Sequence, residues 1–341
     1  MSIRVLIIDD SPTMRAILMS RLQEHRGIAV IGTASNAAEG REMIKRLNPD
    51  VVTLDIEMPG MNGLDFLEKI MTLRPMPVII VSGATQEGNE ITARALALGA
   101  FDCYSKYDPA GKLDLYDSGR LAGLVRQASR VRHHRPGKSA PAIAAESRLT
   151  MRRDTCLIAI GSSTGGVEAL QVLLREFPED CPPTLIVQHV NPRFAPAIAR
   201  TLDATCRARV QVAEHDTLIR PGNVYLAAGA DEHLVVAGKS SLSAKLRRGD
   251  PVSGHCPSVD VLFRSVADVV GHAAVGILLT GMGQDGAKGL LAMAESGAHT
   301  IAQDEATCTV FGMPRAAILL GAAQVVAPIG RIAHLALSKA A

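Results

Sequence analysis

The sequence predicts two α/β domains, each built on a doubly wound parallel sheet with helices on both faces. Two observations support this prediction. Short, continuously apolar segments alternate with segments of helical periodicity along most of the chain. A basic stretch without clear periodicity, residues 132–152, interrupts that alternation. The 341 residues are enough for two domains of ordinary size, each with its own hydrophobic core.

The first half of the chain is expected to contain five βα units. Residues 3–9 are too continuously apolar for a half-exposed strand and are typical of a buried parallel strand. A helix is expected to begin at Ser11-Pro12, because proline fits the first helical position, and to end at Gly27. The remaining elements are expected as strands at 28–33, 51–55, 78–82 and 101–105, and as helices at 37–47, 63–72, 90–98 and 115–131.

The basic stretch separates the two domains. We expect a first domain over residues 1–125, a linker over 126–153 and a second domain over 154–341. The linker holds eight Lys or Arg and one Glu, so its local charge of +7 leaves −5 for the rest of a chain whose net charge is +2. Because it lacks interleaved aromatic residues and a helix-turn-helix pattern, this charge favours a solvated linker over a nucleic-acid-binding segment.

The second half shows the same alternation, with one difference. Short alternating runs separated by glycine, over residues 223–247, predict a β-meander within or beside the main sheet. The clearest strands are expected at 156–161, 184–189, 209–213, 223–227, 274–280, 299–303 and 323–327, and helices at 166–176, 194–205, 259–270, 286–296, 313–320 and 328–339.

The composition favours a cytoplasmic protein. Aromatic residues make up only 3% of the chain and Trp is absent, so both cores must be built from aliphatic residues and Met. No apolar run approaches the roughly 20 residues of a membrane span, and the N-terminus lacks a signal-peptide layout. The six cysteines form no CxxC motif and are expected to be reduced. We expect a monomer without membrane insertion.

Three carboxylates of the first domain are expected to meet at one sheet edge. Asp9 and Asp10 follow the first strand and Asp55 ends the third, and ligands bind beyond the carboxyl ends of such strands. Clustered oxygen ligands favour Mg²⁺. Ser82 ends the fourth strand and Lys106 follows the fifth, where they could hold a phosphoryl group on Asp55. Five suitable residues at strand ends disfavour the alternative that these residues are only helix caps.

This arrangement resembles the receiver domain of bacterial response regulators, over residues 1 to about 125. The resemblance implies a flavodoxin-like fold in which Asp55 is the phosphoacceptor. It also implies that Asp10 and Asp55 ligate Mg²⁺ with the backbone carbonyl of Glu57, and that Asp9 assists. The loop after the acceptor would begin with Met58.

Two positions depart from the receiver pattern. Receivers usually have Pro after the lysine, often with a cis peptide, whereas Tyr107 follows Lys106 here. Since a cis bond before a non-proline residue costs roughly 2.5–4 kcal/mol, we expect a trans peptide or a shifted loop. The position three before the lysine, often aromatic in receivers, is Cys103, which puts the usual aromatic switch in doubt although Tyr104 is adjacent.

The second domain places a serine, a histidine and an aspartate at three strand ends. Ser163 lies in the glycine-rich turn GSSTGG, His189 ends the strand that closes in IVQH, and Asp285 lies in the loop GMGQDG. The glycine-rich turn alone would also suit phosphate binding at a helix N-terminus. Together, the three residues could supply the nucleophile, base and orienting carboxylate of acyl transfer. Ser162 remains a rival nucleophile, because neighbouring serines in a tight turn are not separated by sequence.

Each member of this set has a defined role in acyl transfer. Ser163 would attack a carbonyl carbon, His189 would take the serine proton and later protonate the leaving group, and Asp285 would fix the histidine tautomer. Backbone N–H groups near Thr164 and around Met282 could hold the oxyanion, each such donor typically contributing about 2.7–4 kcal/mol.

The stretches GSSTGG, QHV, GHCPSVD and GMGQDGA resemble the catalytic domain of the chemotaxis protein-glutamate methylesterases. The resemblance implies a Rossmann-like fold and selects Ser163 over Ser162. It implies hydrolysis of glutamate methyl esters on chemoreceptors with release of methanol, and deamidation of receptor glutamines, without any cofactor for the esterase step. The family is expected to carry Arg where Cys256 stands, and we interpret His255 as structural.

The implied partners are chemoreceptors as substrates and a chemotaxis histidine kinase as phosphodonor. Our hypothesis is that the unphosphorylated receiver covers the Ser163 site and that phosphorylation of Asp55 opens it by shifting a population of domain arrangements. A transcription regulator would need a DNA-binding output, which does not follow the linker. A nucleotide-binding protein would need the Lys-Ser/Thr ending of a phosphate loop, which GSSTGG lacks.

Overall fold

The computed structural model divides the chain into two compact units, Met1–Arg135 and Pro136–Ala341. It describes residues 2–58, 63–83, 86–106, 119–131, 157–229, 231–238 and 241–338. Most of the expected linker, from residue 132 to 153, therefore lies outside the described residues, as do Tyr107 and the loop after Met58. The expected domain boundaries stay predictions. Each unit is described by itself.

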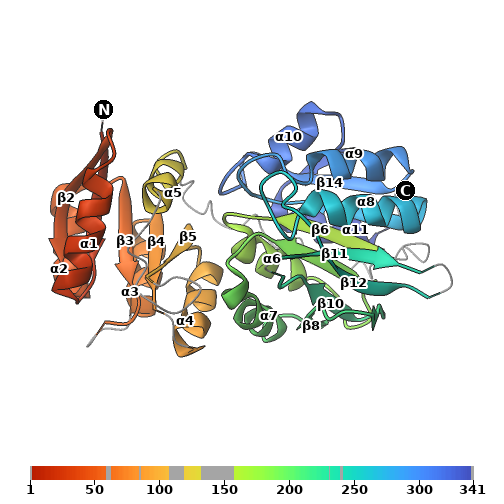
Figure 1. The fold of residues 1–341 in the computed structure, drawn as a ribbon, viewed down its shortest axis with the longest axis horizontal. Coiled ribbons are helices and arrows are strands. Elements are labelled where there is room, and N and C mark those ends of the chain that lie inside the picture. Colours follow the sequence, from red (N-terminus) through yellow and green to blue (C-terminus); the bar gives the residue numbers. More distant parts are fainter. Residues whose placement is uncertain are drawn as a thin grey trace. The chain divides into compact units, whose positions relative to one another are not determined.

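The first unit is a five-stranded, wholly parallel sheet in the order β2-β1-β3-β4-β5 (Figure 1). The order reverses at β1, which is the mark of a doubly wound sheet. Helix α1 contacts α5, and α3 contacts α4. The strands are β1 (Ile3–Ile8), β2 (Ile28–Ala34), β3 (Val51–Asp55), β4 (Val78–Ser82) and β5 (Asp102–Ser105); the helices are α1 (Pro12–Gln23), α2 (Ala37–Leu47), α3 (Gly63–Leu73), α4 (Gln86–Ala97) and α5 (Arg120–Ala128).

Local chemistry accounts for the first helix of this unit. The Ser11 side chain caps α1 by accepting from the N–H of Met14, and Pro12 occupies the first helical position as expected. The strand before it is buried from Val5 to Ile8, which explains its continuous apolar run. The tight connection between this strand and α1 fixes Asp9 and Asp10 at the carboxyl edge of the sheet.

The second unit is a seven-stranded parallel sheet in the order β15-β14-β13-β6-β7-β10-β8. One helical layer contains α6, α7 and α11, and another contains α8, α9 and α10 (Figure 1). The strands are β6 (Leu157–Ser162), β7 (Thr184–Gln188), β8 (Arg209–Val212), β10 (Asn223–Leu226), β13 (Ala274–Leu278), β14 (His299–Gln303) and β15 (Val325–Ala327); the helices are α6 (Gly166–Leu174), α7 (Ala195–Asp203), α8 (Val259–Val269), α9 (Ala287–Glu295), α10 (Met313–Leu319) and α11 (Ile329–Leu337).

The expected meander is divided between two sheets. Strand β10 joins the parallel sheet between β7 and β8, whereas β9 (Thr217–Leu218), β11 (Glu232–Ala237) and β12 (Ser243–Arg248) form a separate antiparallel sheet. The glycine-separated runs predicted the strands correctly, but a run of four residues does not reveal which partner it pairs with.

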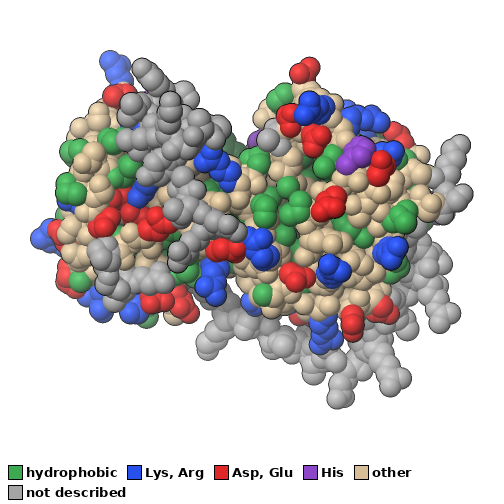
Figure 2. Space-filling model, turned by 60° about the horizontal axis from the view of Figure 1, so that its bottom comes forward, with side chains coloured by type: hydrophobic (Ala, Val, Ile, Leu, Met, Phe, Trp, Pro, Cys, Tyr) green, Lys and Arg blue, Asp and Glu red, His purple; other side chains and the backbone are tan. Residues whose placement is uncertain are grey.

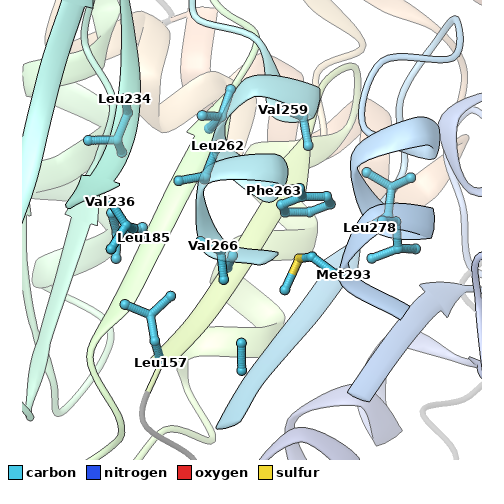
Figure 3. Packing of buried hydrophobic residues seen from close by; sticks show 14 of the residues in the cluster. Leu157, Leu185, Leu234, Val236, Val259, Leu262, Phe263, Val266, Leu278 and Met293 are labelled. Atoms are coloured by element: carbon cyan, nitrogen blue, oxygen red, sulfur yellow. The ribbon is translucent and has the colours of Figure 1, made fainter. Parts of the chain in front are cut away.

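Helix α8 is held between the parallel sheet and the antiparallel hairpin. Its residues Leu262, Phe263 and Val266 are fully buried and belong to the same core cluster as Leu157 of β6 and Leu234 of β11 (Figure 3). Burying one such side chain contributes about 1.5–3 kcal/mol. This packing fixes the position of the N-terminus of α8, which contributes to the functional site.

The surface of the molecule carries both signs of charge. On the face shown in Figure 2, Lys and Arg side chains are interspersed with Asp and Glu. Among the described residues, no helix combines the length and apolar character needed to cross a bilayer.

Candidate functional site

The carboxylates of Asp9, Asp10 and Asp55 converge as expected. One oxygen from each lies within 4.8 Å of the others. Asp9 and Asp55 are buried. Lys106 reaches this cluster from the end of β5, with its Nζ 2.6 Å from Asp55 Oδ2 and 3.1 Å from Asp9 Oδ2. Three carboxylates and one ammonium leave a negative balance, and an all-oxygen donor set of this kind suits Mg²⁺.

Burial and charge oppose each other in this cluster. Burial raises the pKa of Asp9 and the neighbouring Asp55 carboxylate raises it further, although Lys106 acts in the opposite direction. Burial disfavours the charge on Lys106, but Asp55 and Asp9 outweigh this effect and the lysine pKa is raised. The lysine therefore stays charged beside the expected phosphoacceptor.

The other expected residues of this site also lie at the same edge. The N–H of Glu57 donates to Asp55 Oδ1 at 3.0 Å, which places residue 57 against the acceptor carboxylate. Ser82 is buried at the end of β4, and Thr92 of α4 donates a 2.7 Å hydrogen bond to its hydroxyl. Sequence reasoning missed Thr92, because nothing in the periodicity of a helix indicates which side chain reaches a neighbouring strand end.

In the second unit, Ser163 and His189 follow neighbouring strands. Ser162 of β6 pairs in register with Gln188 of β7, and the N–H of His189 donates to the carbonyl of Ser162 at 2.9 Å. Parallel strands paired in this way bring their carboxyl ends to one edge. The expected nucleophile and base therefore start from adjacent positions on that edge.

Asp285 hydrogen-bonds to His189. The distance from His189 Nε2 to Asp285 Oδ2 is 2.9 Å, and the aspartate is fully buried. The hydroxyl of Ser258 donates to Oδ1 at 2.8 Å. In the first turn of α8, the N–H of Val259 donates to Oδ2 at 2.8 Å and the N–H of Asp260 donates to Oδ1 at 3.1 Å. Burial alone would raise the pKa of Asp285, but the bonds from His189, Ser258 and Val259 lower it.

His233 completes this network from β11. It is buried, its Nδ1 accepts from the N–H of Ser258 at 3.1 Å, and its Nε2 lies 3.1 Å from the carbonyl of Asp250. A carbonyl only accepts, so Nε2 carries the proton and the ring is held as one neutral tautomer. Sequence reasoning missed His233 and Ser258, since no motif links β11 to the loop before α8.

The two neighbouring serines have different environments. Ser162 is fully buried and its hydroxyl donates to Gln188 Oε1 at 2.6 Å. Ser163 is half-buried. A buried hydroxyl that is already engaged cannot meet a substrate carbonyl, so the geometry favours Ser163 as the nucleophile.

Two backbone N–H groups lie free near Ser163. Within the described part of the chain, the N–H groups of Thr164 and Met282 have no acceptor, whereas that of Ser163 is taken by the carbonyl of Thr280 at 3.0 Å. The two loops touch at Gly281, where an added Cβ would lie 2.7 Å from Ser163 Cβ. Only glycine permits this approach. The two donors expected for an oxyanion are thus present on adjoining loops.

His255 lies closer to the candidate base than the sequence suggested. Its ring stacks on that of His189, with centroids 3.7 Å apart and planes 6° from parallel. Burial lowers the pKa of His255, and the adjacent His189 lowers it further against the opposing effect of Asp285. The neutral form of His255 is therefore favoured. Its presence in GHCPSVD was the only signal that could have placed it here.

Comparison with known proteins identifies the family to which the chain belongs. A family model described as CheB methylesterase matches residues 158–336, and one described as response regulator receiver domain matches residues 5–114. The chain belongs to the CheB methylesterase family. It is 52% identical, over 94% of this chain and 93% of the relative, to a protein-glutamate methylesterase/protein-glutamine glutaminase of Caulobacter vibrioides. A relative of the same name from Rhizobium etli is 51% identical over 96% of this chain and 94% of its own length.

Solved structures of the CheB family include a close match to the second unit. The methylesterase catalytic domain of Thermotoga maritima CheB is 34% identical and covers 52% of this chain and 95% of its own, with a TM-score of 0.51. The expected two-domain α/β fold, a receiver followed by a methylesterase domain, is therefore confirmed.

Two expected departures of this CheB chain from its family can now be placed. Arg21 of α1 hydrogen-bonds to the hydroxyl of buried Tyr104. The Tyr104 side chain therefore faces α1. Because adjacent strand residues point to opposite faces of a sheet, Tyr104 cannot take the place of an aromatic residue at position 103. Cys256, where Arg is expected, has its Sγ 3.8 Å from the carbonyl of Gly249. The peptide after Lys106 lies outside the described residues.

Proposed function

We propose that this chain is a protein-glutamate methylesterase and protein-glutamine glutaminase whose activity is controlled by phosphorylation of its receiver domain. The observation that carries the proposal is the buried pair of His189 and Asp285, 2.9 Å apart, at the sheet edge that also holds Ser163. These residues are proposed as the catalytic triad. The substrates are methyl-esterified glutamates and certain glutamines of chemoreceptors.

The general base is proposed to be Nδ1 of His189. Nε2 is occupied by Asp285, and Nδ1 is a buried atom with no hydrogen-bond partner in the described part of the chain. Asp285 holds the proton on Nε2, which leaves the Nδ1 lone pair to accept the proton of Ser163. Because Asp285 is kept ionised by its donors, it also stabilises the imidazolium that forms.

The reaction proceeds through an acyl-enzyme. Ser163 Oγ forms a bond to the ester carbon and its proton moves to His189, while the carbonyl oxygen becomes an oxyanion held by the N–H groups of Thr164 and Met282. The tetrahedral intermediate then expels methanol, which takes the proton from His189. Water activated by the same histidine cleaves the acyl-enzyme and releases glutamate. With a glutamine substrate, ammonia leaves in place of methanol.

The receiver is proposed to be phosphorylated on Asp55 by a chemotaxis histidine kinase. Asp10, Asp55 and the carbonyl of Glu57 would hold Mg²⁺, with Asp9 assisting, and the ion would offset the negative charge of a phosphoryl group. Lys106 already contacts Asp55 and can bind a phosphoryl oxygen, and the Ser82 hydroxyl ends the neighbouring strand. The esterase chemistry itself is proposed to need no metal or organic cofactor.

Phosphorylation is proposed to act by repositioning the receiver, which covers the Ser163 site when Asp55 is unmodified. We propose that the protein works as a monomer in the cytoplasm, where the methylated segments of chemoreceptors lie. The test is methanol release from methylated receptor fragments by the full chain and by residues 150–341. We expect the isolated catalytic unit to be faster than the unphosphorylated full chain. Equal rates would contradict steric inhibition without affecting the triad assignment.

A further inference from the structure

Gln188 connects the two residues that carry the proposed chemistry. It is the last residue of β7, is buried, and immediately precedes His189. Its side-chain Nε2 donates to the carbonyl of Ser163 at 2.8 Å and to the carbonyl of His189 at 3.0 Å. One amide group therefore ties together the backbones of the proposed nucleophile and base.

The orientation of this amide is set by its partners. Backbone carbonyls only accept hydrogen bonds, so the nitrogen of Gln188 must face Ser163 and His189. The opposite side of the amide, Oε1, then accepts the 2.6 Å bond from the Ser162 hydroxyl. Both N–H donors and the oxygen are thus engaged. The space is tight, since a Cβ added at Gly166 would lie 2.1 Å from Oε1.

The carbonyl that Gln188 holds belongs to the peptide unit of an oxyanion donor. In a trans peptide the N–H points opposite to the C=O. The carbonyl of Ser163 is bound by Gln188 and by the N–H of Gly166 at 2.7 Å. The N–H of Thr164, in the same peptide unit, is therefore directed away from Gln188 and remains free in the described part of the chain.

The second donor, the N–H of Met282, is oriented in the same way, but by backbone hydrogen bonds and not by a side chain. The carbonyl of Gly281 accepts from the N–H groups of Gly312 and Met313 at 3.1 and 2.8 Å. These bonds turn the N–H of Met282 the other way. Among the hydrogen bonds of the described residues, only those that orient the Thr164 donor include one from a side chain, which makes its orientation accessible to substitution.

We propose that Gln188 is a positioning residue that aims the Thr164 N–H at the oxyanion and keeps Ser162 out of the reaction. This inference rests on the proposed acyl transfer at Ser163. Gln188 touches neither the substrate nor the reacting atoms. It acts by fixing one peptide plane, so its contribution is made in the transition state, where the oxyanion forms.

The test is Gln188→Glu in the full-length chain, assayed by methanol release from a methylated receptor fragment in the presence of acetyl phosphate as phosphodonor. The change retains the shape of the side chain and the acceptor for Ser162, but places a carboxylate oxygen against two carbonyls. We expect kcat to fall about 100-fold, as when one oxyanion donor is lost. KM should change less than about threefold, because ground-state binding is untouched.

The matched control is Gln324→Glu, the same chemical change at the opposite edge of the sheet. Gln324 contacts Thr300, near the beginning of β14, and is exposed. It should leave both kinetic constants unchanged. Gln188→Met provides a second variant, without donors and without charge, and should show the same loss of kcat. Thermal melting reports whether each variant folds.

The outcomes are distinguishable. A folded Gln188→Glu or Gln188→Met variant with kcat within about threefold of the wild type overturns the inference, and so does a loss confined to KM. Failure of both variants to fold shows that Gln188 is only structural and also overturns it. If the wild-type chain itself releases no methanol, the proposed function fails instead.

Discussion

The ring of His255 lies flat against the ring of His189, with centroids 3.7 Å apart. In the described part of the chain, the side chain of His189 makes one hydrogen bond, to Asp285, and a ring held at one atom can still rotate about that contact. The stack supplies a second restraint on the ring plane. His255 is held in place by a tight turn in which Val252 and His255 exchange two backbone hydrogen bonds of 3.0 Å.

His255→Ala is predicted to lower kcat for methanol release about tenfold, because a misplaced catalytic group loses part of its effective concentration. His255→Phe retains a flat ring and should recover most of that loss. Both variants should melt close to the wild type, since His255 is half-buried. Equal activity of the Ala variant and the wild type would show that the stack does not restrain His189.

Ser163→Ala is predicted to abolish methanol release, since the nucleophile is lost. Ser162→Ala should reduce the rate less than about tenfold, because the Gln188 amide keeps both of its carbonyl partners. The measurement is methanol release at saturating substrate, with circular dichroism as the check on folding. The opposite order of activities would assign the nucleophile to Ser162.

The lowered pKa of Asp285 predicts a pH-dependent stability. A carboxyl group whose folded pKa lies below its unfolded value, here near 3.8, stabilises the fold above that value and loses this contribution as the pH falls through the folded pKa. The difference in unfolding free energy between wild type and Asp285→Asn should therefore be full at neutral pH and shrink below about pH 4. Denaturant titrations across this range measure it. A difference that grows on acidification would have the wrong sign.

Ser258→Ala is predicted to destabilise the second unit by about 1–2 kcal/mol, because this residue caps α8. It also removes a donor from Asp285, so the acid limb of the pH–rate profile should shift to higher pH. Ser258→Thr keeps the hydroxyl and serves as the control. A loss of stability without any shift of the acid limb would mean that the hydroxyl caps the helix but does not tune Asp285.

Mg²⁺ is predicted to stabilise the receiver. Asp9, Asp10 and Asp55 repel one another, and an ion that binds only the folded state at a hundredfold its Kd adds about 2.7 kcal/mol. The melting temperature should rise when Mg²⁺ is added to the wild type and should stay unchanged in Asp10→Asn. The Asn variant should also be more stable than the wild type in chelator, because one repelling charge is gone. An equal Mg²⁺ response in both would place the ion elsewhere.

Much of this site could be predicted because it depends on where strands end. Asp55 and Ser82 in the first unit, and Ser163 and His189 in the second, each close or follow a buried apolar run, and in each unit the parallel strands bring such positions to one edge of that unit's own sheet. The contacts of Gln188 could not be predicted, since they depend on a turn that directs the Ser163 carbonyl back toward β7.

Other features depended on pairing and on side-chain direction. The meander was expected within or beside the main sheet, and the structure contains both arrangements: β10 lies within that sheet between β7 and β8, and the later strands lie in a separate one. A four-residue strand carries no signal for its partner. His233 reaches Ser258 across 25 residues of sequence through the packing of the hairpin on α8. Such contacts arise from the tertiary structure, which local periodicity does not encode.

A regulated hydrolase is tested most directly by methanol release from a methylated receptor fragment by the wild type, Ser163→Ala and Asp55→Asn, each with and without acetyl phosphate. We predict that the phosphodonor accelerates only the wild type, that Asp55→Asn keeps the slow unstimulated rate, and that Ser163→Ala releases no methanol in either condition. Methanol release by Ser163→Ala at the wild-type rate, or equal stimulation of Asp55→Asn and wild type, would contradict this assignment of nucleophile and phosphoacceptor.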